Sequence, residues 1–149
     1  KIPRPRKPLV EDLFTVAVMD IQDTSSTLDD ATLRNATEML RGRLSAAGRF
    51  IVIDKSRQEE KIKALVRNSK KESYKACYDK KCQIPLGQAL AADSILRSTV
   101  SCLGTRCLLS LELVDLGKEA SIAGATADFD ATPEGLAQAI RTAAAEVIL

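Results

Sequence analysis

The sequence contains no histidine and no tryptophan, and aromatic residues occupy only 3% of its 149 positions. Without an imidazole, the chain lacks the usual general base of serine hydrolysis, and the Gly-x-Ser-x-Gly motif of a nucleophile elbow is also absent. Neither Gly-x-Gly-x-x-Gly nor a Walker sequence occurs, so the chain has no Gly-rich cradle for phosphate transfer. These absences predict a protein that is not an enzyme and carries no cofactor.

No run of about 18 apolar residues occurs, so the sequence predicts no membrane-spanning helix. The composition, with 45% hydrophobic and 28% charged residues, is that of an ordinary globular domain. A chain of this length buries roughly 70% of the surface that its unfolded form exposes, which allows one core without metal or dense disulfides. Stability alone therefore does not require the four cysteines.

Charged residues are unevenly distributed along the chain, although the formal net charge is only +2. Residues 1–8 carry +4 and residues 55–81 carry +6, so the rest of the chain carries −8. This pattern predicts an acidic body with one basic segment. Residues 1–8 also include three prolines, which favour an extended tether. We expect a tether over residues 1–12, preceded by a signal sequence or an anchor, and one domain over residues 13–149.

The first third of the domain has the pattern of a strand, a helix and a second strand. The run Phe14–Ile21 is apolar and rich in β-branched residues, as buried strands are. Thr27–Asp30 resembles a capping box, and apolar residues then recur at helical spacing until Gly48. Phe50–Asp54 is a second short apolar run. A β-α-β unit of this kind predicts two parallel strands.

The middle third is more polar. Ser56–Glu59 is another capping-box pattern, and it predicts a helix with few apolar residues that ends near Asn68. Ile84–Ala92 predicts a short helix with Pro85 in its first turn. Gly87 within that helix indicates a close approach to a neighbouring element.

The last third predicts three strands and a helix. Short glycine-containing turns separate the runs Ser94–Leu103, Cys107–Asp115 and Glu119–Phe129, which predict an antiparallel meander. Thr132 and Pro133 then predict the cap and first turn of a final helix. The order β-α-β-α-α-β-β-β-α predicts an α/β fold, with a mixed sheet of about five strands and helices packed on its faces.

Three stretches of the sequence resemble a known group of bacterial cell-envelope domains. They are Val16–Asp20, Phe50–Asp54, and the segment that runs from Cys77 through Cys82 to Asp93. With the order of elements over about residues 13–149, they are similar to the TolB amino-terminal-like and CsgG/LpoB-like group, in the form common among myxobacteria. The resemblance implies a periplasmic module that binds other envelope proteins and shares no catalytic apparatus. Some members of the group assemble into rings or regulate cell-wall enzymes.

The four cysteines form two pairs, Cys77 with Cys82 and Cys102 with Cys107, and each pair encloses four residues. The second pair would face each other across a four-residue hairpin loop, where Cβ atoms about 4.5–5.5 Å apart can approach disulfide geometry. The leading interpretation is two local disulfides, which require an oxidising compartment. A crossed pairing, a single bridge, free thiols and a zinc site are the alternatives, although zinc ribbons favour a two-residue spacing.

The basic segment contains the candidate binding surface. Its helix buries little, and a disulfide in the following loop would hold that loop in one shape before binding. We expect the recognition patch to consist of Lys70, Lys71, Tyr74, Lys75, Tyr78, Lys80 and Lys81. The expected partner is an acidic envelope protein or an anionic envelope polymer, and a plain solvated helix face is the alternative. The sparse aromatics and the acidic remainder of the chain argue against nucleic acid.

Aspartates also stand at the ends of the predicted strands. They are Asp20, Asp23, Asp54, Asp93 and Asp115. The carboxyl ends of parallel strands often face a binding site. We nevertheless interpret these residues as turn and capping residues rather than as a metal or acid-base cluster.

Together these patterns favour a non-enzymatic interaction domain of the cell envelope. We expect it to be periplasmic, tethered to a membrane through its N-terminal side, and monomeric or weakly dimeric when isolated. The alternative from a different class is a thiol-disulfide or metal-responsive sensor built on the same scaffold.

Overall fold

The computed structural model describes residues 13–69 and 80–148. Four helices and six strands follow one another along this part of the chain. In chain order they are β1 (Phe14–Val18), β2 (Gln22–Asp23), α1 (Asp30–Ala46), β3 (Phe50–Val52), α2 (Lys55–Ser69), α3 (Lys80–Ala89), β4 (Ser94–Leu103), β5 (Arg106–Asp115), β6 (Ala120–Asp130) and α4 (Pro133–Ile148).

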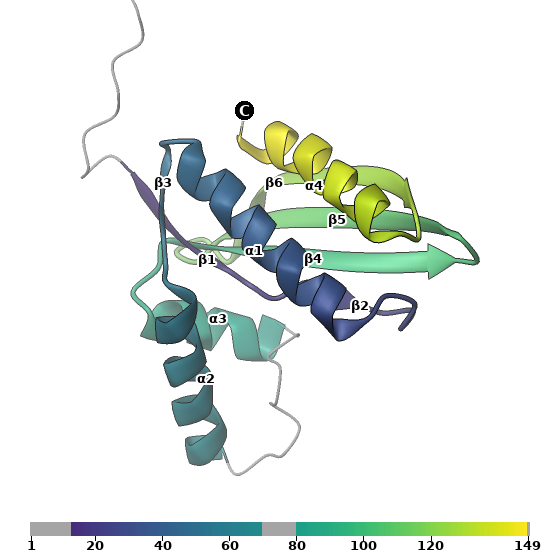
Figure 1. Ribbon diagram of the computed structural model, residues 1–149. Helices are drawn as coiled ribbons and strands as arrows, with labels where there is room; N and C mark the ends of the chain where they lie inside the picture. Colours follow the sequence, from purple (N-terminus) through teal and green to yellow (C-terminus); the bar gives the residue numbers. More distant parts are fainter. Residues whose placement is uncertain (1–12, 70–79, 149) are drawn as a thin grey trace, which may run out of the picture.

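The strands form one mixed sheet in the order β3-β1-β4-β5-β6 (Figure 1). β1 lies parallel to both β3 and β4, whereas β4, β5 and β6 form an antiparallel meander. The predicted α/β class, the parallel β-α-β unit and the meander are therefore confirmed. The short strand β2, which pairs with β4, was not predicted because two residues carry no periodic pattern.

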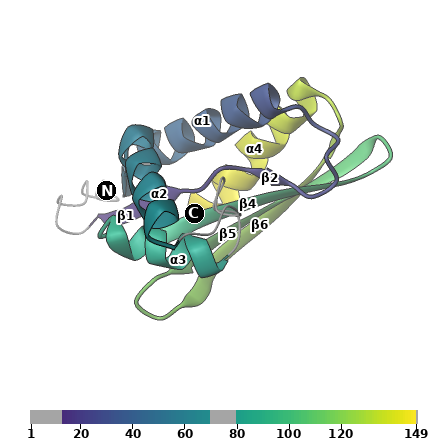
Figure 2. The same cartoon turned by 90° about the horizontal axis from the view of Figure 1, so that it is seen from below.

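Helices cover the two faces of the sheet unequally. α1 and α4 lie side by side on one face, and α3 lies on the other (Figures 1 and 2). The larger core lies under α1 and α4, where Leu40, Leu44 and Ile140 are fully buried. A smaller core joins α3 to the opposite face through Leu86, Ile95 and neighbouring residues.

The starts of three helices differ from the predictions. The side chain of Asp29, not Thr27, caps α1 by accepting from the N–H of Thr32, because residues 23–28 are held in a turn around Asp23. The carbonyl of Asp54 accepts the first backbone hydrogen bond of α2, so Ser56 lies inside the helix rather than at its cap.

The third difference is that α3 begins at Lys80 and places Pro85 inside the helix instead of in its first turn. A proline there cannot donate to the carbonyl of Lys81, but Lys81 is exposed, so water can replace the missing donor. Gly87 makes the predicted close approach. A Cβ atom at this position would lie 2.7 Å from Leu116 Cδ1 and 2.8 Å from Ile95 Cγ2.

The β4–β5 hairpin is tighter than predicted. Leu103 pairs with Arg106, which leaves Gly104 and Thr105 as a two-residue turn instead of a four-residue loop. Gly104 adopts a φ of +65°, a conformation that glycine tolerates without steric cost. Cys102 and Cys107 are consequently direct cross-strand partners.

Candidate interaction surface

Helix α2 forms the first part of the basic segment and precedes the predicted patch residues in the sequence. It points away from the sheet, and α3 lies beside it (Figure 1). Among the side chains described for this helix, Gln58 is buried and Ile62 is partly buried, whereas Arg57 and Lys63 are exposed. The side chains described for this helix therefore contribute little to the core, and the exposed ones include the acids Glu59 and Glu60 as well as these cations.

A buried polar network attaches the start of α2 to the body. Gln58 Nε2 donates to the carbonyl of Val18 at 3.0 Å, and Arg41 Nη2 donates to the same oxygen at 3.1 Å. Arg41 also forms an ion pair with Glu38 on α1. Two side chains thus satisfy the carbonyl at the end of β1, as buried polar groups require, and they fix α2 relative to α1.

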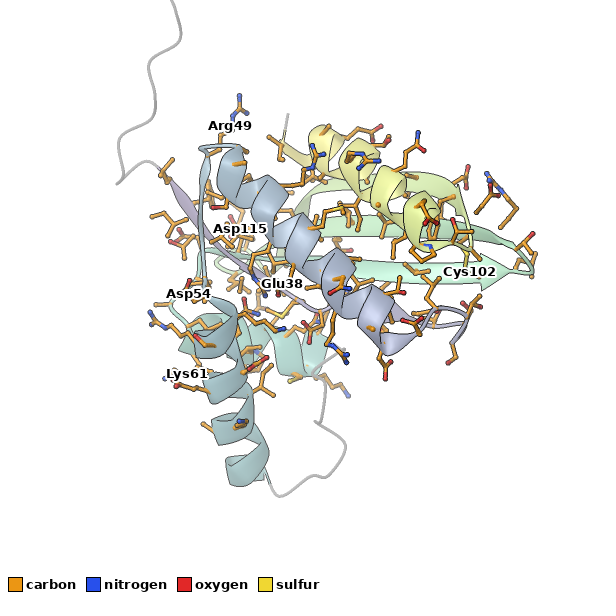
Figure 3. The ribbon with its side chains drawn as sticks, viewed as in Figure 1. Glu38, Arg49, Asp54, Lys61, Cys102 and Asp115 are labelled. Atoms are coloured by element: carbon orange, nitrogen blue, oxygen red, sulfur yellow. A yellow bond between two sulfur atoms is a disulfide. The ribbon has the colours of Figure 1, made fainter. Side chains whose placement is uncertain are left out.

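This network lies where the connections of neighbouring strands diverge. β1 leads to α1 on one face of the sheet, while β3 leads to α2 on the other side, and such switch points often form ligand crevices in α/β sheets. A hollow of about 350 Å³ lies here, with Glu38, Arg41, Asp54 and Lys55 in its wall (Figure 3 labels Glu38 and Asp54). Glu38 pairs with Arg41 and, at 3.8 Å, with Lys55, so opposite charges in this crevice compensate one another.

Asp20 is the one carboxylate of this region whose pKa is raised. Part of the residue is open to solvent, but the surrounding protein atoms desolvate its carboxylate, and this burial raises the pKa. The positive charges of Arg41 and Lys55 offset the increase only in part. The nearby negative charges of Glu59 and Glu38 also raise the pKa of Asp20, with smaller effects than burial.

Two other aspartates at strand ends, Asp23 and Asp115, act as turn residues, as expected, whereas Asp93 connects two strands. Asp23 accepts from the backbone N–H groups of Ser25, Thr27 and Leu28. Asp93 accepts from Thr15 N–H, and Asp115 accepts from Lys118 N–H. In the part of the chain that the structure describes, no three potential ligands gather closely enough to hold a metal ion.

Two of the predicted patch lysines can be placed, and both are exposed on the first turn of α3. Lys80 Nζ lies 3.3 Å from Glu112 Oε1 on β5, and Arg97 Nη1 lies 3.5 Å from the same oxygen. Lys81 has no described acidic partner. Of the two, only Lys81 is thus available to a partner without first breaking an ion pair.

The remaining predicted patch residues lie outside the described residues. They are Lys70, Lys71, Tyr74, Lys75 and Tyr78. Cys77 also lies outside them, whereas Cys82 is disulfide-bonded and buried next to Leu86 in the smaller core. The patch therefore remains a prediction.

The Cys102–Cys107 disulfide is present, as predicted. Its Cα atoms lie 4.0 Å apart on paired positions of β4 and β5. Ser25 Oγ accepts from Cys102 N–H, and Arg106 pairs with Asp130 at 3.0 Å, so the end of the hairpin is connected to the β2 loop and to β6. No described cysteine is free.

Sequence reasoning overlooked Arg41 and Gln58. A signal for Arg41 was present, because it falls on the same helical stripe as Thr37, Leu40 and Leu44, which are all buried. A long cation on a core-facing stripe indicates a buried acceptor within its reach. Gln58 gave no comparable signal, since its helix has few apolar positions to define a face.

No helix among residues 13–69 and 80–148 combines the length and apolar content needed to cross a membrane. No known protein family matches the sequence. No curated protein matches it either.

The described fold is nevertheless shared with solved structures. The LpoB C-terminal domain from Escherichia coli matches with a TM-score of 0.62 at 16% identity, over 77% of this chain and 81% of that one. The lipoprotein GNA1162 from Neisseria meningitidis matches with a TM-score of 0.60 at 20% identity, over 78% and 79%. TolB from Acinetobacter baumannii matches with a TM-score of 0.53 at 12% identity, over 87% of this chain but 26% of that protein. At these identities the likeness shows a common fold.

Proposed function

We propose that this chain is a non-enzymatic, periplasmic protein-binding domain of a bacterial cell-envelope complex. The fold that it shares with LpoB domains and with a Neisseria lipoprotein supports an envelope role. The described disulfides support an oxidising compartment. In this proposal residues 1–12 form the tether to a membrane, and the narrower TolB-like or CsgG-like assignment belongs to the same proposal.

The observation that carries the proposal is the position of α2. The helix leaves the body, buries Gln58 at its start and exposes Arg57 and Lys63 beside Glu59 and Glu60, within a segment that carries +6 over residues 55–81. Surface cations of this kind steer association with an acidic partner more than they increase affinity. The proposed recognition patch consists of Lys70, Lys71, Tyr74, Lys75, Tyr78, Lys80 and Lys81.

Charge reversal within the patch tests this proposal. One variant carries Glu in place of four patch cations, which are Lys70, Lys71, Lys75 and Lys81. A matched control carries Glu in place of four exposed cations of the body, which are Arg34, Arg43, Lys118 and Arg141. Both variants change the net charge equally, so a loss caused by overall charge would appear in both.

We expect the patch variant to keep its melting temperature nearly unchanged and to lose capture of envelope proteins in pull-downs. The control should capture the same proteins as the parent chain. Equal capture by both variants would show that the patch is only a solvated face. A patch variant that unfolds would be replaced by the corresponding Gln variant, which removes charge without adding acid.

The structural disulfides do not favour the sensor alternative. Cys107 and Cys82 are both buried, and each is bonded, so neither presents an accessible thiolate. The cysteines therefore fit a structural role within the proposed interaction domain.

A further inference from the structure

Strand β6 forms the outer edge of the sheet, at the opposite end from β3 and α2. It extends over 11 residues, and no described strand pairs with its outer side (Figure 1). The other edge strand, β3, has only three residues. β6 therefore offers a much longer row of backbone groups for pairing.

The register shows which groups face outward. In a two-residue hairpin the flanking pair, Leu103 with Arg106, exchanges hydrogen bonds, so Arg106 directs its backbone groups toward β4. Because this direction alternates along a strand, Cys107 directs its groups toward β6, where it is paired with Phe129. Along β6 the same alternation leaves the N–H and C=O groups of Gly124, Thr126 and Asp128 facing the free edge.

This edge lacks the features that usually protect edge strands. Residues 120–127 contain neither a charged residue nor a proline, and four of the eight are alanine. Natural edge strands are commonly protected by Lys, by Pro or by short length. A bulge near Ile122 interrupts the pairing at one end, but the register from Ala123 to Asp130 is continuous. The unprotected stretch is therefore long enough for another strand.

The charges around the edge indicate which charge a bound segment should carry. A groove of about 630 Å³ follows β6, and its wall includes Glu112 on β5 and Glu146 on α4. Glu112 is already paired with Lys80 and Arg97, so Glu146 is the acid of this wall that can attract a cation. No described cation pairs with Glu146. Glu119 and Asp128, near the two ends of the strand, are also exposed. Residues 120–127 of the edge are thus uncharged, and Glu119, Asp128 and Glu146 make its surroundings acidic.

We propose that β6 is a second binding site, which accepts an extended cationic segment of a partner protein as an added strand. The segment would pair with the outward N–H and C=O groups of Gly124, Thr126 and Asp128, while its Lys or Arg side chains on one face approach Glu146. A second copy of β6 is a poorer occupant, because symmetric pairing would bring a second set of the same acids to the groove. This site does not depend on the recognition patch, which lies at the α2–α3 connection in the sequence and is called the α2–α3 patch.

The test is an NMR titration of the full chain, labelled with ¹⁵N, with the capped peptide Lys-Thr-Lys-Val-Lys-Thr-Lys-Val at low salt. Two further peptides carry N-methyl groups on alternate amides, either at every Lys or at every Thr and Val. An added strand uses the amides on one side only. One methylated peptide should therefore bind as tightly as the unmethylated peptide, and the other at least 10-fold more weakly. The amide signals of Gly124, Thr126 and Asp128 should shift most.

Variants of the protein give the matched comparison. Thr126→Pro removes one outward donor without touching the β5–β6 ladder and should weaken binding about 10-fold, whereas Thr126→Val keeps that donor and should bind as the parent does. Glu146→Lys should weaken binding several-fold at low salt, with a smaller difference at high salt. If Thr126→Pro fails to fold, the methylated peptides test the same hydrogen bonds on the unaltered chain.

Three outcomes would overturn the proposal. The first is equal binding of both methylated peptides, and the second is a set of shifts located away from β6. The third is a concentration-dependent dimer that shows the β6 shifts without peptide, which would make a second copy the occupant. Each outcome leaves the charge-reversal test of the α2–α3 patch unaffected, so the two proposals fail separately.

Discussion

The two faces of the sheet differ in how much they bury. Among the described residues, the core under α1 and α4 contains 20 buried side chains, whereas the core on the α3 face contains 9. Because stabilisation grows with the apolar area removed from water, most of it comes from the first face. Helix α2 can extend into solvent without unfolding the chain, since the opposite side of the sheet carries the stability.

This difference also separates residues that fold the chain from residues that can bind. α1 and α4 use their apolar stripes on the sheet and on each other. The contact between α2 and the body depends largely on the polar network of Arg41, Gln58 and the Val18 carbonyl. The exposed cations Arg57 and Lys63 on α2 take no part in this network.

The largest difference is expected between Leu40→Ala and Ile62→Ala. Leu40 is fully buried in the larger core, so its truncation should lower the free energy of unfolding by about 2–5 kcal/mol. Ile62 is only partly buried on α2, so its truncation should cost about 1 kcal/mol or less. Urea denaturation followed by circular dichroism measures both. Similar losses would contradict the unequal division of stability.

A pair of glycine substitutions compares a packed position on α3 with an exposed position on α1. Gly87→Ala places a methyl group against Leu116 and Ile95 at distances below 3 Å, and overpacking of this kind costs about 1–3 kcal/mol. Gly42 is exposed in α1 and has no neighbour within 4 Å of the added carbon. Gly42→Ala should therefore stabilise the helix by about 0.5–1 kcal/mol. Thermal melts of the two variants should shift in opposite directions.

Removal of the hairpin disulfide should have a moderate effect. The bridge closes a short loop, since its cysteines are five residues apart, and the chain-entropy relation gives about 2 kcal/mol for such a loop. The double variant Cys102→Ala with Cys107→Ala should lose about this amount in urea denaturation. Leu103→Ala at the same hairpin end is the control, because Leu103 is 90% exposed and should change stability by less than about 0.5 kcal/mol.

The better-packed face is also the one that the sequence predicted well. Leu40 and Leu44 on α1, and Leu136 and Ile140 on α4, fall on helical stripes, and the structure buries all four. The meander strands had clear alternation and glycine turns, so their bounds were predicted within one or two residues. Apolar periodicity is the strongest local signal, and it exists where a face is buried.

On the α2–α3 side the same reasoning had little to use. The start of α3 at Lys80 was missed because its first turn is polar and the proline in the helix indicated a later start. β2 and the Arg41–Gln58 network depend on groups brought together by the fold, such as the carbonyl of Val18. Contacts between residues far apart in sequence leave no periodic pattern, so the candidate site was predicted from charge, two tyrosines and an expected loop disulfide.

The smallest expected changes in stability concern two aspartates, Asp20 after β1 and Asp23 in β2, and these changes have opposite signs. Partial burial raises the pKa of Asp23, but hydrogen bonds from Ser25, Thr27 and Leu28 outweigh it and lower the pKa below its usual value. The pKa of Asp20 is raised by desolvation, which Arg41 and Lys55 only partly offset. The two carboxylates should therefore contribute to stability with opposite dependence on pH.

For Asp23 the folded pKa is the lower one, so its contribution is present above the unfolded value of about 3.8 and is lost as the pH falls through the folded pKa. Asp23→Asn should thus be less stable than the parent chain at pH 7, with the difference shrinking in acid. For Asp20 the folded pKa is the higher one, so ionisation in the folded state lowers stability as the pH rises above about 3.8. Asp20→Asn should be more stable than the parent chain at pH 7, and the two should be equally stable below a pH of about 3.8. Urea denaturation between pH 3 and 7 measures both, and the same sign for the two variants would contradict the assigned causes.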